Sequence, residues 1–373
     1  MDDPLAGERA FVGELAGDQP GGWDLAGELP ADLLRKLGAK GILCAEVPAS
    51  FGGLGATSRD SGELTAYVGG LCSSLRSIMT SQGMAAWTIQ RLGDRGQRQR
   101  YLASLTGGQL AAVAFSEPAA GSDLSAMQTR IRPDGGAVVL DGQKMWVTGA
   151  RYADLLVVLG LHGDGAAFVV VPASAPGVHA ELVADPLGCR AAGHSHIRFD
   201  QVRLPASSVL GGGGQSLPLL FTTALSFGRM SVAWGCAGIV RACLAAATSH
   251  ARNREQSGQP LASHQLIARH LAELLIAEQV STRVCEHASQ CWESASPDMV
   301  VAAVLAKHVS AGHAARSAAT AVQVLASAGA QDGHLVARAY RDAKLMEIIE
   351  GSNEICQLIL AQHALTLRPD PLS

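Results

Sequence analysis

The sequence predicts an α+β protein in which a segment of short strands separates two helical segments. Residues 1–110 follow a helical apolar period, residues 111–212 change to short apolar runs with glycine turns, and residues 213–373 return to long, alanine-rich helical patterns. At 373 residues the chain is long enough for two or three domains. We therefore expect an N-terminal helical domain, a middle β domain and a C-terminal four-helix bundle with these bounds.

The first segment contains short amphipathic helices. Leu33, Leu34 and Leu37 share one face of a helix that is expected over 31–37, and a second helix is expected over 74–92. Glycines between these stretches indicate that the helices are short and separated by turns.

The middle segment contains two hairpin signals. Val138–Leu140 and Lys144–Val147 flank an Asp-Gly pair at 141–142, a frequent two-residue hairpin turn. Leu155–Leu161 and Ala167–Val171 flank a Gly-Asp-Gly turn in the same way. The pattern predicts a compact all-β domain, either a small barrel or a sandwich.

Four consecutive glycines at 211–214 predict a hinge or turn before the third segment. Ser263 is a suitable N-cap for the first helix of a series. The apolar periods predict helices over 263–292, 300–328, 335–350 and 353–364.

Composition excludes several classes of protein. The net charge is −4 and no long basic or acidic block is present, so we expect neither a nucleic-acid partner nor an anionic membrane surface. The acidic N-terminal residues do not resemble a secretory signal, and no uninterrupted run of about 18 apolar residues predicts a membrane span. The eight cysteines form no Cys-x-x-Cys pair, and no His-Glu-x-x-His is present, so we expect reduced thiols, no metal site and a cytoplasmic location.

Glu350 is the first candidate for chemistry. It ends an apolar helical pattern, and Gly351 is suited to the left-handed residue that terminates a helix. The negative end of a helix dipole and nearby apolar side chains would both favour a carboxyl group that acts as a general base near neutral pH. Taken alone, the heptapeptide 348–354 favours an ordinary glutamate at a helix end with Gly351 as its cap.

Two further segments are candidates for a flat, phosphate-bearing cofactor. The loop 114–123 is rich in small residues, and its backbone N–H groups and the Ser122 hydroxyl could hold a pyrophosphate, although an ordinary surface loop is the alternative. On a strand, Trp146 and Thr148 would point to the same face, where an indole and a hydroxyl could meet a heterocycle. The alternative is that Trp146 belongs to the core.

The order of these segments resembles that of the acyl-CoA dehydrogenases over nearly the whole chain. The resemblance rests on the stretches 114–123, 141–149, 187–205, 254–265 and 341–355. It implies FAD as the cofactor and Glu350 as the base that removes the proton beside a thioester carbonyl, while the β-hydrogen leaves as hydride.

The resemblance also assigns expected roles to other residues. Arg229 and Gly351, together with Ser122, are expected beside the substrate. Three of the cofactor contacts would reach FAD in a neighbouring subunit, which implies a homodimer or homotetramer. The expected cofactor contacts are Phe115, Ser116, Gly121, Ser122, Trp146, Thr148, Ser352 and Glu354, with Arg254, Gln265 and Gln323 reaching the neighbouring subunit.

The chain departs from the family pattern at several positions. Ser257 stands where phenylalanine is usual, Val113 replaces a common aromatic residue, and Ala326 with Ser327 stands where two glycines usually approach the pyrophosphate. A looser contact with the cofactor is expected at the last of these positions.

A narrower resemblance concerns the dehydrogenases that help to make methoxymalonyl-acyl-carrier-protein, an extender unit for polyketide and antibiotic biosynthesis. It rests on the stretches 71–76, 79–84, 189–194 and 344–350. It implies a glyceryl-derived three-carbon substrate bound to an acyl carrier protein (ACP). One alternative is a catabolic dehydrogenase of short or branched acyl-CoA. Others are a flavin-binding protein without dehydrogenase activity, a relative that uses flavin with oxygen as an oxidase or monooxygenase, and a purely structural helical protein. The electron acceptor is not identified by the sequence.

Overall fold

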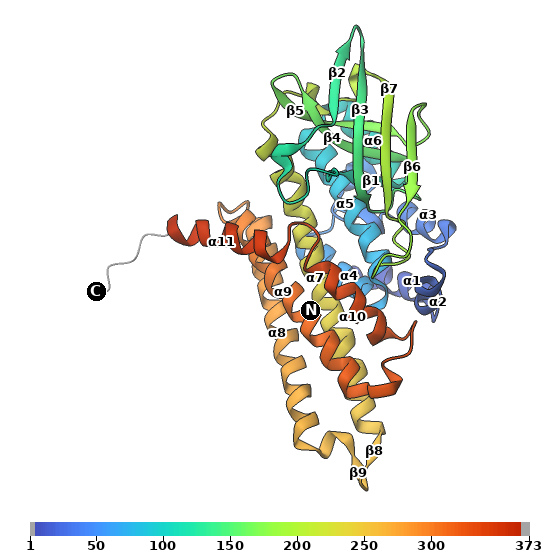
Figure 1. Ribbon diagram of the computed structural model, residues 1–373, viewed down its shortest axis with the longest axis vertical. Helices are drawn as coiled ribbons and strands as arrows, with labels where there is room; N and C mark the ends of the chain where they lie inside the picture. Colours follow the sequence, from blue (N-terminus) through green and yellow to red (C-terminus); the bar gives the residue numbers. More distant parts are fainter. Residues whose placement is uncertain (1–3, 367–373) are drawn as a thin grey trace, which may run out of the picture. The chain divides into compact units, whose positions relative to one another are not determined.

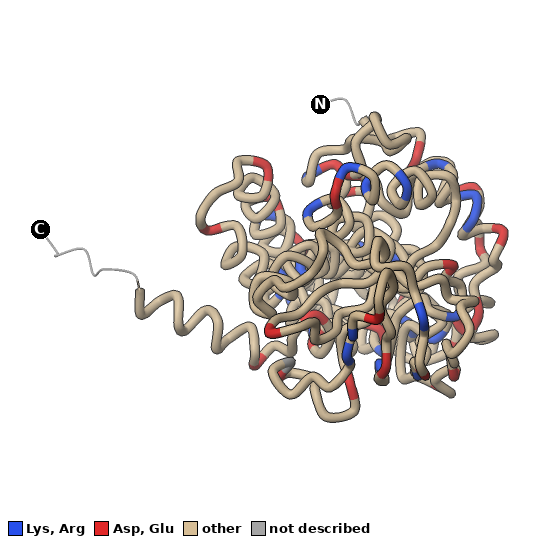
Figure 2. Tube along the Cα trace, turned by 90° about the horizontal axis from the view of Figure 1, so that it is seen from above, with Lys and Arg blue, Asp and Glu red and all other residues tan. Residues whose placement is uncertain are grey.

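The computed structural model describes residues 4–366, and the chain divides into two compact units. The first unit comprises residues up to 61 and residues 74–228, and the second comprises residues 62–73 and those from 229 onward. Two helices, α4 (Ser58–Leu71) and α7 (Leu217–Asn253), begin in the first unit and continue into the second. Positively and negatively charged positions are interspersed along the chain rather than gathered into blocks of one sign (Figure 2).

Helices form the N-terminal part of the first unit. The helix expected over 31–37 is present, with Leu33, Leu34 and Leu37 buried. Asp94 and Gln97 form a reciprocal capping box at the start of the last helix. The helices are α1 (Ala6–Ala16), α2 (Pro20–Ala26), α3 (Ala31–Ala39), α5 (Ser73–Leu92) and α6 (Arg95–Thr106).

A curled, seven-stranded sheet forms the rest of the first unit (Figure 1). Its order is β1-β4-β2-β3-β7-β6, and β5 pairs with the other side of β4. The expected hairpin around residue 164 is confirmed, because β4 and β5 pair antiparallel up to His162 and Gly165. The strands are β1 (Ala111–Ala114), β2 (Arg130–Asp134), β3 (Ala137–Val147), β4 (Leu155–His162), β5 (Gly165–Pro172), β6 (Val178–Leu182) and β7 (Ser195–Pro205).

The hairpin predicted at Asp141 and Gly142 is wrong. Both residues lie inside the continuous strand β3, where the pairing with β7 shifts register. A Cβ atom at Gly142 would lie 2.5 Å from the Thr129 hydroxyl oxygen, so the glycine permits a close approach within the sheet. The hairpin turn lies earlier in the chain, between β2 and β3, which are joined through Gly135 and Gly136.

The second unit contains the predicted helical bundle. Helix α9 packs against α8, α10 and α11, and buried residues of α7 share one core cluster with those of α8 and α9 (Figure 1). The α4 and α7 helices approach closely, since a Cβ atom at Gly238 would lie 1.8 Å from the Ala66 carbonyl oxygen. The remaining elements are α8 (Gln265–Glu293), α9 (Met299–Leu325), α10 (Leu335–Met346), α11 (Asn353–Thr366) and the two-residue strands β8 (Glu255–Gln256) and β9 (Gln259–Pro260).

Two predicted helix ends are wrong. Ser263 belongs to a 3-10 turn, and α8 begins after His264, which makes no side-chain capping bond. Helix α10 ends at Met346, so Glu350 lies in the turn beyond the helix. The apolar residues Ile348 and Ile349 extend the helical pattern beyond the end of the helix, although Ile348 is exposed.

Helix α7 is apolar and long enough to cross a membrane by length and composition alone, with a mean hydropathy of 1.5 over 18 residues. The helix does not contain an uninterrupted run of about 18 apolar residues, because Arg229 and Arg241 interrupt it. Since 72% of that window is buried inside the protein, the packing of the helix accounts for its composition.

Candidate active site

The loop after β1 is held by a buried ion pair in the first unit. The Lys144 ammonium group lies 2.8 Å from a Glu117 carboxylate oxygen and donates to the Phe115 carbonyl oxygen, also at 2.8 Å. The Glu117 carboxylate in turn accepts hydrogen bonds from the backbone N–H groups of Gln128 and Thr129. Strand β3 and both ends of the loop are thereby fixed to one another.

Burial and pairing act on these two groups in opposite directions. Burial lowers the pKa of Lys144 to about 8, against the opposing effect of Glu117. Burial alone would raise the pKa of Glu117, but Lys144 and the two backbone donors hold that pKa below its ordinary value. The pair is fully hydrogen-bonded, as a buried charge requires.

The residues expected to contact the flavin lie at the exposed side of this anchored loop. Gly121 and Ser122 are exposed, while Phe115 and Ser116 are half-buried. The Ser116 carbonyl oxygen accepts a hydrogen bond from the Met145 N–H, which links the loop to β3 beside Trp146. The loop therefore presents small side chains and a hydroxyl to solvent while its base is rigid.

Trp146 is exposed at the end of β3. Half of its surface is accessible, so the alternative that it belongs to the core is wrong. Trp146 has a φ of +55° and lies at a second register shift of β3, and Thr148 lies one residue beyond the end of this strand. The expectation that both side chains point to the same face of a strand therefore does not apply to them. The two residues nevertheless border one ring: the Trp146 indole lies 5.7 Å from the His194 imidazole, and the Thr148 hydroxyl oxygen lies 3.2 Å from its Nδ1.

His194 is a buried residue that the sequence analysis did not single out for chemistry. Burial, together with the charge of Arg76, lowers its pKa to about 4, so the imidazole is neutral at pH 7. Within residues 4–366, its Nε2 atom is one of a few buried side-chain nitrogens without a hydrogen-bond partner. A buried polar atom of this kind calls for a partner, which a bound polar ligand can supply.

This histidine gives a testable pH dependence. The folded state binds the proton only near pH 4, whereas the unfolded state binds it near pH 6.5, so the stabilising contribution is present above pH 6.5 and is lost on acidification toward pH 4. From pH 7 to 5 we expect a loss of about 2 kcal/mol from this group. Urea unfolding of the holoenzyme at both pH values should show that His194→Asn loses correspondingly less stability than the parent protein. An equal loss in both proteins would contradict the assignment.

In the second unit, Glu350 lies in a turn with two consecutive left-handed residues. Its φ is +56°, and that of Gly351 is +89°. The Arg229 Nε atom donates to the Glu350 carbonyl oxygen at 3.1 Å. A Cβ atom at Gly351 would lie 3.4 Å from the Arg229 guanidinium, so the glycine suits both the backbone angle and the neighbouring cation. The structure thus brings together Arg229, Glu350 and Gly351.

The turn contains a second cation that the sequence analysis missed. The Lys307 ammonium group is fully buried and lies 2.7 Å from the Gly351 carbonyl oxygen. A signal was present, since Lys307 follows a long apolar stretch of an alanine-rich helix whose other permanently charged residue is Arg316. Such a lysine must find partners in the interior.

The other predicted contacts in the second unit lie at helix ends. Ser352 accepts a hydrogen bond from the Ile355 N–H and thereby caps α11, in which Glu354 is exposed. Arg254, Gln265 and Gln323 are exposed on the chain, so their surfaces are open to a neighbouring subunit. Their contact with a neighbouring subunit stays a prediction, as does the joining of the first unit's loop and Glu350 in one site.

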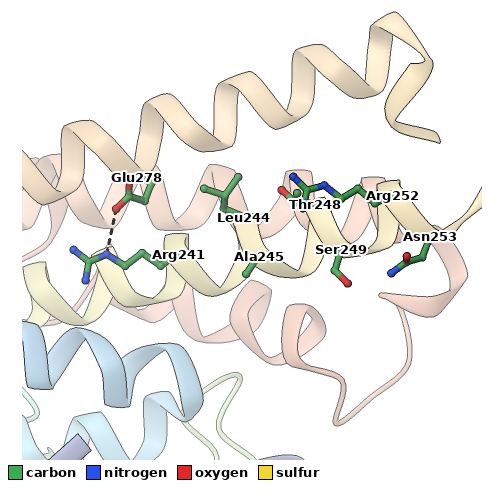
Figure 3. A pocket seen from close by; sticks show the side chains of 8 residues that line it. All are labelled: Arg241, Leu244, Ala245, Thr248, Ser249, Arg252, Asn253 and Glu278. Atoms are coloured by element: carbon green, nitrogen blue, oxygen red, sulfur yellow. Dashed lines mark hydrogen bonds and ion pairs between the residues drawn. The ribbon is translucent and has the colours of Figure 1, made fainter. Parts of the chain in front are cut away.

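A separate groove of about 600 Å³ lies along α7 and α8 in the second unit (Figure 3). Arg241 reaches from α7 to Glu278 on α8 and is also paired with Glu63. None of the residues that line the groove belongs to the predicted site. The groove is therefore distinct from the chemistry discussed above.

A helical part, a curled sheet and a second helical part follow one another along the chain, and the turn between the last two helices contains the Glu350 carboxylate. This arrangement is that of an acyl-thioester dehydrogenase. The chain belongs to the acyl-CoA dehydrogenase family. The family's N-terminal, middle and C-terminal domain models match residues 7–109, 112–202 and 219–365, respectively. The predicted boundaries at 110 and 212 fall between these matches, but they stay predictions.

The chain is similar to individual members of this family to different degrees. A probable acyl-CoA dehydrogenase of Bacillus subtilis strain 168, YngJ, is 31% identical over 350 residues, or 92% of each chain. The solved structure of FkbI, described as an enzyme for biosynthesis of the methoxymalonyl extender unit of a polyketide immunosuppressant, is 62% identical, with a TM-score of 0.93 over 96% of this chain and 99% of FkbI. A glutaryl-CoA dehydrogenase from Mycobacterium smegmatis, solved in complex with FADH2, is 26% identical, with a TM-score of 0.92 over 99% and 95% of the two chains.

The enzyme is accordingly an FAD-dependent oxidoreductase that acts on CH–CH groups of acyl thioesters. The residues present in the first unit fit such a cofactor. The loop offers the exposed Gly121 and Ser122 to a phosphate, and a half-exposed indole stands beside the Thr148 hydroxyl. These observations agree with the FAD contacts that the sequence predicts, whose individual assignments stay predictions.

Proposed function

We propose that the enzyme oxidises an ACP-bound, glyceryl-derived three-carbon thioester on the route to hydroxymalonyl- and methoxymalonyl-ACP. The observation that carries this proposal is the 62% identity with FkbI over 96% of the chain. The curated acyl-CoA dehydrogenase YngJ is only 31% identical. That difference favours the extender-unit reaction over a catabolic one.

In the proposed reaction Glu350 takes the proton from the carbon beside the thioester carbonyl. Bound FAD would supply the acceptor for the hydride that leaves the neighbouring carbon. Arg229 holds the Glu350 backbone through its carbonyl oxygen. Removal of the proton requires that the carboxylate meet the α-carbon on the face opposite the hydride acceptor, so the position of Glu350 matters as much as its basicity.

Polar groups of the first unit support a hydroxylated substrate. Arg76 is fully buried, lies close enough to His194 to lower the pKa of that residue, and donates to the Thr80 hydroxyl at 3.1 Å. The Nε2 atom of His194 is buried and without a partner among the described residues. A purely alkyl chain would leave such a nitrogen unsatisfied, whereas a hydroxyl or carboxyl oxygen can bond to it.

The proposal includes assembly and location. The enzyme is a cytoplasmic homodimer or homotetramer, in which Arg254, Gln265 and Gln323 reach FAD in the neighbouring subunit. Their exposure on the single chain supports this assignment. Nucleic acids and membranes are not partners in this proposal.

The identity of the carrier tests the proposal. Glyceryl-derived ACP thioesters should reduce the flavin at least tenfold faster than butyryl- or isobutyryl-CoA at equal concentration. Stopped-flow absorbance measures the reduction, and mass spectrometry of the ACP identifies the oxidised acyl group. Faster turnover of the CoA thioesters would instead support the catabolic acyl-CoA dehydrogenase. A protein that binds FAD but is reduced by neither substrate would be the flavin-binding protein without dehydrogenase activity.

A further inference from the structure

The turn that contains Glu350 has a backbone that the chain does not favour by itself. Helix α10 ends at Met346, and the chain then turns through Glu350 with φ +56° and Gly351 with φ +89°. A residue other than glycine in the left-handed region is strained by about 1–2 kcal/mol. Such a turn persists only when its surroundings hold it, so the contacts that hold it also determine where the Glu350 side chain begins.

Lys307 contacts three oxygen atoms of this turn. From the middle of α9, its ammonium nitrogen lies 2.7 Å from the Gly351 carbonyl oxygen and 3.4 Å from both the Glu347 carbonyl oxygen and the Asn353 Oδ1. An ammonium group has three protons to donate, so one side chain connects positions on both sides of Glu350. Asn353 also donates to the Glu347 side chain at 3.2 Å, which closes the turn.

The interior position of Lys307 is unfavourable for a charge. The side chain is fully buried, and burial lowers its pKa below the ordinary value for lysine. A buried ammonium group is retained at a free-energy cost of several kcal/mol unless carbonyl or carboxylate oxygens compensate. An apolar residue would fill this position at lower cost, so the contacts with the turn are what the lysine contributes.

Arg229 and Lys307 contact consecutive peptide units of the turn. Arg229 donates to the carbonyl oxygen of Glu350, and Lys307 donates to that of Gly351. The Cys356 thiol donates to the Gly351 oxygen as well, at 3.6 Å. The backbone of the proposed base is thus fixed from α7, α9 and α11.

We infer that Lys307 is a positioning residue that holds the Glu350 turn in the conformation required for proton removal. The inference rests on the proposed role of Glu350 and deepens it. Lys307 itself touches no reacting atom: it acts through the backbone of the turn and through its positive charge.

The test uses Lys307→Met in the FAD-loaded enzyme, because methionine keeps the length and shape but removes the charge and the donors. FAD should stay bound, the half-saturating substrate concentration should change less than threefold, and flavin reduction should slow by about 10- to 100-fold. Lys344→Gln is the matched control: it also removes a positive charge near the Glu350 turn, but Lys344 lies in the last turn of helix α10, is exposed and pairs with the Glu347 side chain. It should reduce its flavin at the parent rate.

The pH profile distinguishes a positioning role from a merely structural one. Arg229 and Lys307 both interact electrostatically with Glu350, and Cys236 and Cys356 are the other titratable groups that act on Lys307. Loss of one of two positive charges disfavours the ionised carboxylate, so the acidic limb of the reduction rate should move to higher pH. General loosening of the fold predicts no shift in this direction.

The outcomes separate this inference from the proposed function. A parent-like rate and pH profile in Lys307→Met, with Glu350→Gln inactive, would overturn the inference alone. A parent-like rate in Glu350→Gln would overturn the proposed function itself. Lys307→Gln, which keeps one donor without the charge, serves as a second variant. If neither Lys307 variant folds with FAD, the residue is a requirement of the fold and the positioning role is rejected.

Discussion

Glu350→Gln is expected to keep its FAD and to lose flavin reduction by acyl thioesters by about two to four orders of magnitude. Glutamine has nearly the same shape as glutamate but cannot accept the α-proton. The backbone of the turn is held by bonds to carbonyl oxygens from Arg229 and Lys307, which the substitution does not touch. The loss should therefore appear in the rate of the chemical step, measured by stopped-flow absorbance in a single turnover.

A matched control separates the loss of the base from a general loss of charge. Glu273→Gln removes an exposed carboxylate on α8 that pairs only with its helical neighbours Arg269 and His270. This variant should bind FAD and reduce it at the parent rate. If Glu350→Gln is reduced as quickly as this control, another group removes the proton, and Glu350 is then an ordinary residue of the turn.

The order of the secondary-structure segments was predictable because it depends on local periodicity. Leu33, Leu34 and Leu37 are buried on one helical face, as their spacing indicates. The Asp-Gly pair at 141–142 shows where local information fails. The same dipeptide suits a tight turn and a register shift, and only the close approach of Thr129 to Gly142 decides between them.

The candidate site was predictable only where the chemistry lies in a short motif. Glu350 and Gly351 are adjacent in the sequence, and their roles followed from the family resemblance. Lys307 lies more than forty residues before the turn that it holds, and His194 lies 46 residues after Thr148. No local period links such pairs, because the contacts arise from the packing of whole elements. A charge after a long apolar stretch of an alanine-rich helix was the available signal for Lys307.

Lys144→Met is expected to destabilise the protein by about 3–5 kcal/mol, the effect of removing one partner of a buried ion pair. The side chains of Lys144 and Glu117 are only 0% and 4% exposed, so water cannot replace the lost ammonium group. The Glu117 carboxylate would keep its two backbone donors but lose its counter-charge. Chemical denaturation of the holoenzyme at pH 7 measures the loss, and FAD affinity should fall as well because the loop beside Ser116 loses its anchor.

The double variant Lys144→Met with Glu117→Gln identifies the cause. It removes both charges and leaves one amide oxygen, which can accept from one of the N–H groups of Gln128 and Thr129, since these two bond to different oxygens of Glu117. If the uncompensated carboxylate is responsible, the double variant should be more stable than Lys144→Met by at least 1–2 kcal/mol. FAD affinity should stay low in both, because the bond from Lys144 to the Phe115 carbonyl oxygen is absent in both. Equal stability of the single and double variants would assign the loss to this carbonyl bond instead of to the ion pair.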